Sequence, residues 1–150
     1  MTKEEFIRIA TEAARACSRV SGFSSGITVA QAALESAWGE SRLSREALNY
    51  FGIKAHGTGP FIEMATTEVR GGKPFRCTER FARYDSMQTC FADRDHLIAT
   101  LGGYAEARAC AGDPEAFLRA LAKHWATDPQ YAEKVLAIYR AGCLGDLDQP

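Results

Sequence analysis

The stretch that decides the fold is residues 30–39, Ala-Gln-Ala-Ala-Leu-Glu-Ser-Ala-Trp-Gly. Its small and apolar residues predict a buried helix from about Thr28 to Trp38 that ends at Gly39. Glu35 falls in the last turn of this helix, where a carboxylate among buried neighbours needs a reason. Burial, the negative end of the helix dipole and the ring of Trp38 all favour a raised pKa. We therefore interpret Glu35 as a candidate general acid, with a partly exposed surface glutamate as the alternative.

Helices are predicted on both sides of this stretch. Thr2 and Glu5 form a capping box for a helix over residues 3–20. Ser41 begins a short helix that reaches Ala47, and Asp85-Ser86 begins another that Gly102-Gly103 stops. Asp113-Pro114 and Asp128-Pro129 each place an acidic N-cap before a proline, and they open helices that run to Trp125 and to Gly142. We expect the tail after Cys143 to be frayed.

A different pattern interrupts the helices near the middle of the chain. Residues 61–69 and 74–84 are rich in Thr, Val, Phe and Tyr, and they flank Arg70-Gly71-Gly72-Lys73. This arrangement predicts a β-hairpin with a glycine turn. The fold class is therefore α+β and mostly α, a helical domain with an inserted hairpin lobe. The cleft between the two parts suits an extended polymeric substrate.

The hairpin supplies three candidates for the second carboxylate that glycosidases usually need. These are Glu63, Glu68 and Glu79. Because Glu63 and Glu68 are five residues apart, they face opposite sides of a regular strand. Glu68 lies beside the glycine turn, whereas Glu63 lies nearer the root of the strand. For each of the three, a solvated charge on a strand is the alternative interpretation.

Composition limits the partners of the chain. Its 150 residues are 46% hydrophobic and carry a net charge of −1. We expect one domain over residues 1–150. The charge balance argues against a nucleic-acid partner, and no apolar run reaches the roughly 20 residues that span a bilayer. Glu4 and Glu5 lie where the apolar part of a secretory signal would begin, so we expect synthesis without a Sec signal or a trimmed chain.

The sequence lacks the residue patterns that other types of reaction would need. The five cysteines include no C-x-x-C pair, and the three histidines lack metal-ligand spacing. No nucleophile elbow and no phosphate-binding glycine loop occur. We therefore expect no cofactor and no metal. Six aromatic residues are candidates to line a sugar-binding groove, although a core position is the alternative for each: Trp38, Tyr50, Phe51, Tyr84, Trp125 and Tyr131.

Four segments in order resemble glycoside hydrolase family 73, the β-N-acetylglucosaminidases of bacterial cell walls. They are residues 30–39, Asn49-Tyr50-Phe51-Gly52-Ile53-Lys54-Ala55, Thr66-Thr67-Glu68 before the glycine turn, and Ala126-Thr127-Asp128-Pro129-Gln130-Tyr131-Ala132. The family includes the hydrolase half of the flagellar rod-assembly protein, autolysins and some phage lysins. The resemblance covers roughly residues 5–140, and four ordered motifs are more specific than any one of them.

The resemblance implies a lysozyme-like fold and cleavage of peptidoglycan at the β-1,4 bond between N-acetylglucosamine and N-acetylmuramic acid. By motif, Glu35 is the general acid and Glu68 the second carboxylate, as a base or an electrostatic partner. Tyr131 lines the catalytic subsite. The groove residues implied alongside them are Trp38, Asn49, Tyr50, Phe51, Lys54 and Tyr84. For Asn49 and Lys54, a structural role is the alternative interpretation.

Two alternatives stay open at this point. A lytic transglycosylase or muramidase on the same fold needs only one acidic residue, and a wall-binding domain needs none. We also hypothesise that the basic, glycine-rich turn closes over the glycan and carries Glu68 toward Glu35. A passive turn is the alternative. We expect a monomer that acts on the cell wall, delivered as a phage or prophage lysin or by a dedicated exporter.

Overall fold

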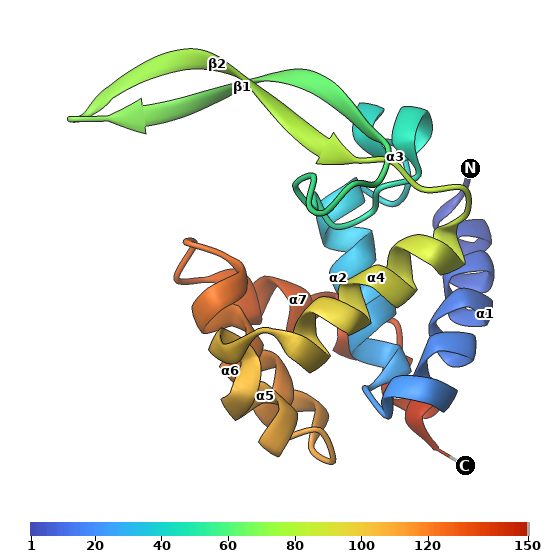
Figure 1. Ribbon diagram of the computed structural model, residues 1–150. Coiled ribbons are helices and arrows are strands. Elements are labelled where there is room, and N and C mark those ends of the chain that lie inside the picture. Colours follow the sequence, from blue (N-terminus) through green and yellow to red (C-terminus); the bar gives the residue numbers. More distant parts are fainter. Residues whose placement is uncertain (150) are drawn as a thin grey trace.

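The architecture is a helical body with one projecting β-hairpin (Figure 1). The structure is a computed structural model that describes residues 1–149. Its elements in chain order are α1 (Lys3–Ser21), α2 (Ser25–Ser36), α3 (Arg42–Ala47), β1 (Phe61–Arg70), β2 (Lys73–Ala82), α4 (Met87–Thr100), η1 (Gly102–Tyr104), α5 (Ala105–Ala109), α6 (Pro114–Trp125), α7 (Tyr131–Ala141) and η2 (Leu144–Asp148). The predicted α+β class is confirmed. Within residues 1–149, no helix is both long and apolar enough to cross a membrane.

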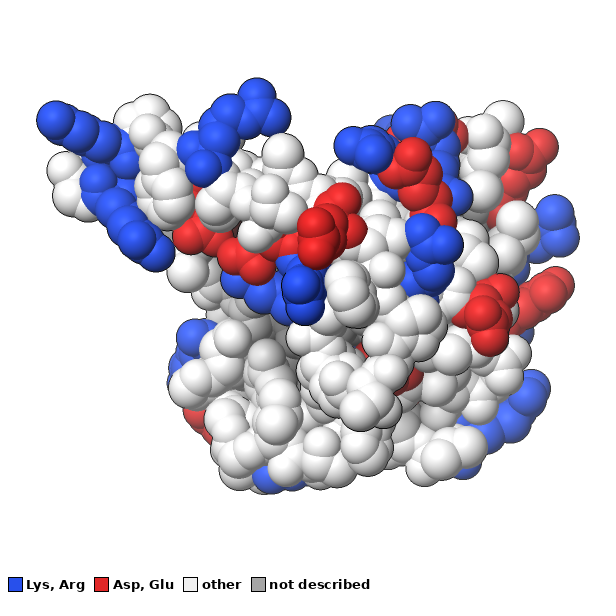
Figure 2. Space-filling model, turned by 45° about the horizontal axis from the view of Figure 1, so that its top comes forward, with Lys and Arg blue, Asp and Glu red and all other residues white. Residues whose placement is uncertain are grey.

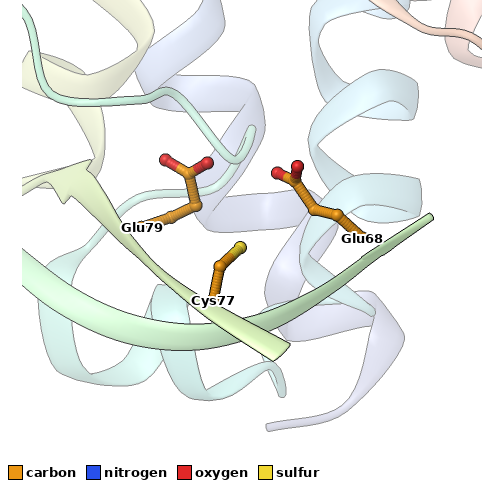
Figure 3. Close-up of side chains that lie close together, drawn as sticks. All are labelled: Glu68, Cys77 and Glu79. Carbon is orange, nitrogen blue, oxygen red and sulfur yellow. The ribbon is translucent and has the colours of Figure 1, made fainter. Parts of the chain in front are cut away.

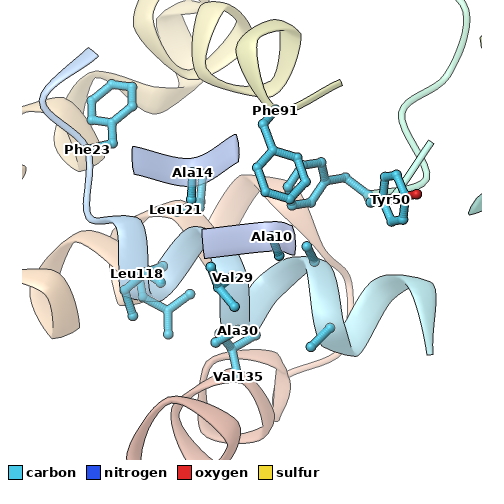
Figure 4. Close-up of a cluster of buried hydrophobic side chains, with 14 of the residues drawn as sticks. Ala10, Ala14, Phe23, Val29, Ala30, Tyr50, Phe91, Leu118, Leu121 and Val135 are labelled. Atoms are coloured by element: carbon cyan, nitrogen blue, oxygen red, sulfur yellow. The ribbon is translucent and has the colours of Figure 1, made fainter. Parts of the chain in front are cut away.

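Helix α2 is the centre of the helical body. Ten of its 12 residues are buried, because α1, α6, α7 and η2 all pack against it. Figure 4 shows how the core forms from these helices, with Ala10 and Ala14 of α1, Val29 and Ala30 of α2 and Val135 of α7 close together. Small side chains let the helices approach closely around α2. Its last turn emerges from this packing, and this turn carries Glu35.

The predicted ends of α2 were wrong. The helix begins at Ser25, and Ser24 caps it by accepting a hydrogen bond from the Ile27 amide at 3.0 Å. Gly26 lies within this helix, and only glycine fits there because a Cβ would lie 2.3 Å from the Leu144 carbonyl oxygen. At the other end, Ala37 adopts the left-handed conformation with φ 51° and ends the helix before Gly39. The cap is therefore a non-glycine residue, which the pattern did not indicate.

The predicted fraying after Cys143 was also wrong. Residues 144–148 form η2, and Leu144 is buried against the body. The Asp148 carboxylate accepts hydrogen bonds from the Ser24 hydroxyl at 2.6 Å and from the Gly26 amide at 3.2 Å. A carboxylate at the start of a helix satisfies free amides and complements the helix dipole. The end of the described chain therefore caps α2.

The other helix starts follow the sequence except in one case. The capping box of Thr2 and the caps at Ser41, Ser86 and Asp113 are confirmed. Helix α7 begins at Tyr131 rather than beside Asp128. The Asp128 side chain instead accepts from the Gln130 amide and pairs with Lys134. The start of α7 is thus shifted, and Tyr131 becomes its first residue.

The hairpin forms as predicted, and hydrogen bonds attach it to the body near its base. Gly71 and Gly72 make the turn with φ 55° and 77°. The Asn49 side-chain amide donates to the carbonyls of Ile53 and Ala82, at 2.8 and 3.0 Å. The backbone of the Ile53 loop also bonds to the end of β2. The outer part of the hairpin projects from the body (Figure 1).

The Asp148 cap generates a stability prediction. Asp148→Ala leaves the Ser24 hydroxyl and the Gly26 amide without their acceptor, so we expect the free energy of unfolding to fall by about 1–3 kcal/mol. Urea unfolding monitored by circular dichroism measures this change. Asp146→Ala in the same turn is the matched control, because no hydrogen bond involves the Asp146 side chain within residues 1–149. Equal losses in both variants would contradict the cap.

Candidate active site

Glu35 lies in the last turn of α2, at the wall of a cleft of about 770 Å³. One side of the cleft is the loop from Phe51 to His56, and the other is formed by the end of α6 and the start of α7. This volume is within the range of ligand sites, roughly 300–1,000 Å³. Most of α2 is packed against other helices, whereas Leu34 and Glu35 in its last turn are partly exposed to the cleft.

The surroundings of Glu35 favour its protonated form. Burial raises the pKa of its carboxyl, and hydrogen-bond donors on Tyr131 and Trp125 offset part of that rise. The neighbouring ring is therefore that of Trp125, not of Trp38 as the sequence suggested. Trp38 follows the end of α2 in the left-handed conformation, and its ring packs edge-on against Phe6, with 6.0 Å between the ring centroids.

Tyr131 is the second predicted residue in this cleft. It is the first residue of α7 and is 5% exposed. Burial, followed by the negative charge of Glu35, raises the pKa of its hydroxyl, which keeps the proton. The group is thus available as a donor toward the Glu35 carboxylate, although no hydrogen bond of standard geometry is made to it within the described residues. The structure brings Glu35 and Tyr131 together, as predicted.

The predicted groove residues divide into two groups. Phe51 and Lys54 line the same cleft as Glu35. Asn49 does not line it, because Asn49 is 1% exposed and its amide joins the loop to the hairpin base. Tyr50 is also outside the cleft, in the core against Phe6 and Phe91. The structure therefore favours a structural role for Asn49 and a position in the core for Tyr50.

Tyr84 lies behind the cleft rather than in it. Its hydroxyl donates to the Asp93 carboxylate at 2.6 Å, and the same oxygen lies 2.7 Å from His56 Nε2. His56 lines the Glu35 cleft, so Tyr84 contributes to one wall through Asp93. Sequence reasoning missed this cluster, because the three residues come from separate segments without a common motif.

Glu68 lies on the hairpin and is not among the residues that line the Glu35 cleft. It shares one face of the hairpin with Cys77 and Glu79, as Figure 3 shows. One ligand atom from each of these three residues lies within 4.8 Å of the others, a spacing that would fit a metal ion. Glu79 also forms an ion pair with Lys54 at 3.5 Å, and this pair balances the charge of Glu79 without a metal ion. Glu63 faces the other side and pairs with Arg80, as its parity predicted.

Charge is unevenly distributed along the hairpin. In Figure 2, Lys and Arg side chains cover the projecting end, and carboxylates lie closer to the body. Arg70 and Lys73 flank the turn and Arg76 follows on β2. A basic end suits an anionic polymer, and the carboxylates of the hairpin lie between this end and the body.

The helical body, the hairpin lobe and the partly buried Glu35 carboxyl of raised pKa in an open cleft define a lysozyme-like domain. The profile of the family described as "Glucosaminidase: Mannosyl-glycoprotein endo-beta-N-acetylglucosaminidase" matches residues 11–144. The chain belongs to this family, which confirms the resemblance drawn from the four motifs.

Known proteins support this assignment. The chain is 35% identical over 144 residues to the peptidoglycan hydrolase FlgJ of Pseudomonas aeruginosa, covering 91% of this chain and 36% of that protein. It is 33% identical to the exo-glucosaminidase LytG of Bacillus subtilis, covering 82% of this chain and 45% of that protein. The catalytic domain of the autolysin Auto from Listeria monocytogenes superposes with a TM-score of 0.86 at 25% identity, covering 97% and 86% of the two chains. The chain thus spans less than half of these two curated relatives.

The contact between Tyr131 and Glu35 generates a prediction on the pKa of the acid. A donor to the carboxylate stabilises its charged form, so Tyr131→Phe removes that stabilisation and raises the pKa of Glu35. An NMR titration of the Glu35 side-chain carboxyl carbon measures the change. Tyr50→Phe, which removes the hydroxyl of a core tyrosine that does not line the cleft, is the control and leaves the pKa unchanged. A Glu35 pKa that falls or stays constant in Tyr131→Phe is the contrary result.

Proposed function

We propose that this chain is an endo-β-N-acetylglucosaminidase that cleaves peptidoglycan between N-acetylglucosamine and N-acetylmuramic acid. The observation that carries the proposal is Glu35, a partly buried carboxyl with a raised pKa at the wall of an open cleft. Such a group keeps its proton to higher pH and can give it to a leaving glycosidic oxygen. Family membership and the names of the relatives support the substrate. We propose that residues 1–150 act on the wall as one monomeric domain.

In the proposed reaction Glu35 protonates the glycosidic oxygen, and Tyr131 stabilises the resulting carboxylate. Glu68 acts as the second carboxylate, on a water or on the developing positive charge of the sugar. Because Glu68 does not line the Glu35 cleft, this scheme requires the hairpin to bend toward the body. The attachment of the hairpin near its base is compatible with such bending.

Two variations of the reaction have observations in their favour. A lytic transglycosylase needs one acid only, and the separation of Glu68 from the cleft favours it. Cleavage from the chain end, in place of internal cleavage, is favoured by the relative named exo-glucosaminidase. The products distinguish all three: internal hydrolysis gives fragments with a reducing N-acetylglucosamine, a transglycosylase gives an anhydro-muramic end, and an exo-enzyme gives small products from the start.

Digestion of purified sacculi by wild type and by Glu35→Gln tests the proposal. We expect wild-type products to end in reducing N-acetylglucosamine by mass spectrometry. Loss of the acid lowers the rate by at least about 100-fold while the circular dichroism spectrum stays unchanged. Sacculi that are bound but never cut by the wild type would instead indicate a wall-binding domain.

The role of Glu68 has its own test. We expect Glu68→Gln to lower kcat by about 100-fold if Glu68 acts on water or on the sugar. Glu63→Gln is the matched control, because Glu63 lies on the same strand and faces away, and its kcat stays near that of the wild type. A Glu68→Gln enzyme of normal rate would eliminate the two-carboxylate scheme and leave the single acid.

A further inference from the structure

A full positive charge is buried behind the helix that carries the acid. Arg94 of α4 is 0% exposed. Its Nη1 donates to the Thr28 hydroxyl at 2.9 Å and to Asp95 Oδ1 at 2.7 Å, and the ion pair with Asp95 balances its charge. Its Nε and Nη2 both donate to Gln31 Oε1, at 3.2 and 2.7 Å. Arg94 therefore directs two of its donors at the residue one helical turn before Glu35.

These two hydrogen bonds fix the orientation of the Gln31 carboxamide. The oxygen and the nitrogen of a carboxamide point in different directions from one carbon, and only the oxygen accepts. With Oε1 held by Arg94, Nε2 is turned away from the guanidinium. Gln31 is 0% exposed, and its Nε2 is a buried donor without a hydrogen-bond partner among residues 1–149. Leaving such a donor unpaired costs free energy, so its direction calls for an explanation.

The partner that fits is the Tyr131 hydroxyl. It is the second buried side-chain atom without a hydrogen bond in the described chain. Burial and then Glu35 raise the pKa of Tyr131, while the Gln31 donor and the positive charge of Arg94 lower it, so the hydroxyl is close to both Glu35 and Gln31. A hydroxyl can accept from Gln31 and donate to Glu35 at the same time.

We propose that Arg94 and Gln31 are positioning residues for the acid and act through Tyr131. Arg94 orients Gln31, Gln31 Nε2 donates to the Tyr131 oxygen, and the Tyr131 hydroxyl donates its proton to the Glu35 carboxylate. All donors in this series, which we call the Arg94 relay, point from the buried guanidinium toward Glu35. The relay rests on the proposed role of Glu35 as the acid.

The relay serves the step in which Glu35 loses its proton. At that point a carboxylate forms in a partly buried place, and burial disfavours it. A donor already aimed at the carboxyl stabilises the new charge without reorganisation. No hydrogen bond of standard geometry is made at Gln31 Nε2 or at the Tyr131 hydroxyl among residues 1–149, so the relay requires these links to form when substrate binds. Catalytic hydrogen bonds often tighten in this way when substrate binds.

A double-mutant cycle tests the relay. Gln31→Glu keeps the acceptor for Arg94 but replaces the donor with an oxygen that competes with Glu35 for the Tyr131 proton. We expect kcat to fall about tenfold, the loss of one charge-assisted hydrogen bond, with KM unchanged and the pKa of Glu35 raised. In the Tyr131→Phe background the same substitution leaves kcat unchanged and raises the Glu35 pKa by less than in the wild type. If Gln31→Glu lowers kcat by the same factor in the wild type and in Tyr131→Phe, the relay is wrong.

Thr28→Val is the matched control. It removes another acceptor of Arg94 on the same helix but leaves Gln31 and Tyr131 in place. We expect it to lower stability and to leave the pH profile of kcat unchanged. The other titratable and charged groups of the cleft are the same in every variant: Lys54, His56, Tyr104, Asp128 and Lys134. A change in the pH profile of Thr28→Val equal to that of Gln31→Glu would mean that packing alone explains the effect.

Two further readouts test the relay even if Gln31→Glu does not fold or the proposed function is wrong. If Gln31→Glu does not fold, the relay is tested in Tyr131→Phe, where the titration of Glu35 is the first readout. In addition, the amide resonances of the Gln31 side chain are followed by NMR in Tyr131→Phe. A shift relative to wild type supports the contact, and unchanged resonances overturn it. Because this readout and the Glu35 titration need no turnover, they decide the relay even if sacculi are not cut.

Discussion

The burial of the Arg94 guanidinium is the constraint on which the interior depends. A charge without water must be paired and hydrogen-bonded, or the fold loses several kcal/mol. Arg94 donates to Thr28 and Gln31 of α2 and to Asp95 of its own helix, α4. Asp95 in turn accepts a hydrogen bond of 2.8 Å from Ser21 at the end of α1, so the network joins three helices. Apolar packing alone permits helices to slide, whereas these directional bonds set the register of α4 against α2. Glu35 takes its position from that register.

Local signals in the sequence predicted those parts of the fold that local chemistry determines. The capping residues at Thr2, Ser41 and Asp113 accept amides within their own helices, and the glycine turn of the hairpin needs only its own backbone. The ends of α2 and the final turn could not be predicted in this way. A segment more than 100 residues later packs closely on Gly26, and Asp148 caps the helix from there. Such contacts leave no pattern near either residue.

The same distinction applies to the site. Glu35 was recognisable because a carboxylate in an apolar helix conflicts with its surroundings, and Tyr131 because its motif resembles a family. Trp38 was placed beside Glu35 on the assumption that the helix continues, but two left-handed residues turn its ring toward α1. Gln31 and Arg94 gave no signal, since a buried glutamine and a buried arginine read as surface residues until their partners are known.

The two candidate carboxylates are held in different ways, and this difference is informative about the reaction. Glu35 is on a helix whose neighbours enclose it, which fixes the donor to within the small tolerance that proton transfer needs. Glu68 is on a two-stranded hairpin, a structure with little stability of its own, attached to the body near its base. In the proposed reaction the glycan enters the open cleft first, and the hairpin then brings Glu68 toward it. This arrangement would keep the acid on the rigid part and place the required movement on its partner, so that binding of the glycan does not disturb the proton donor.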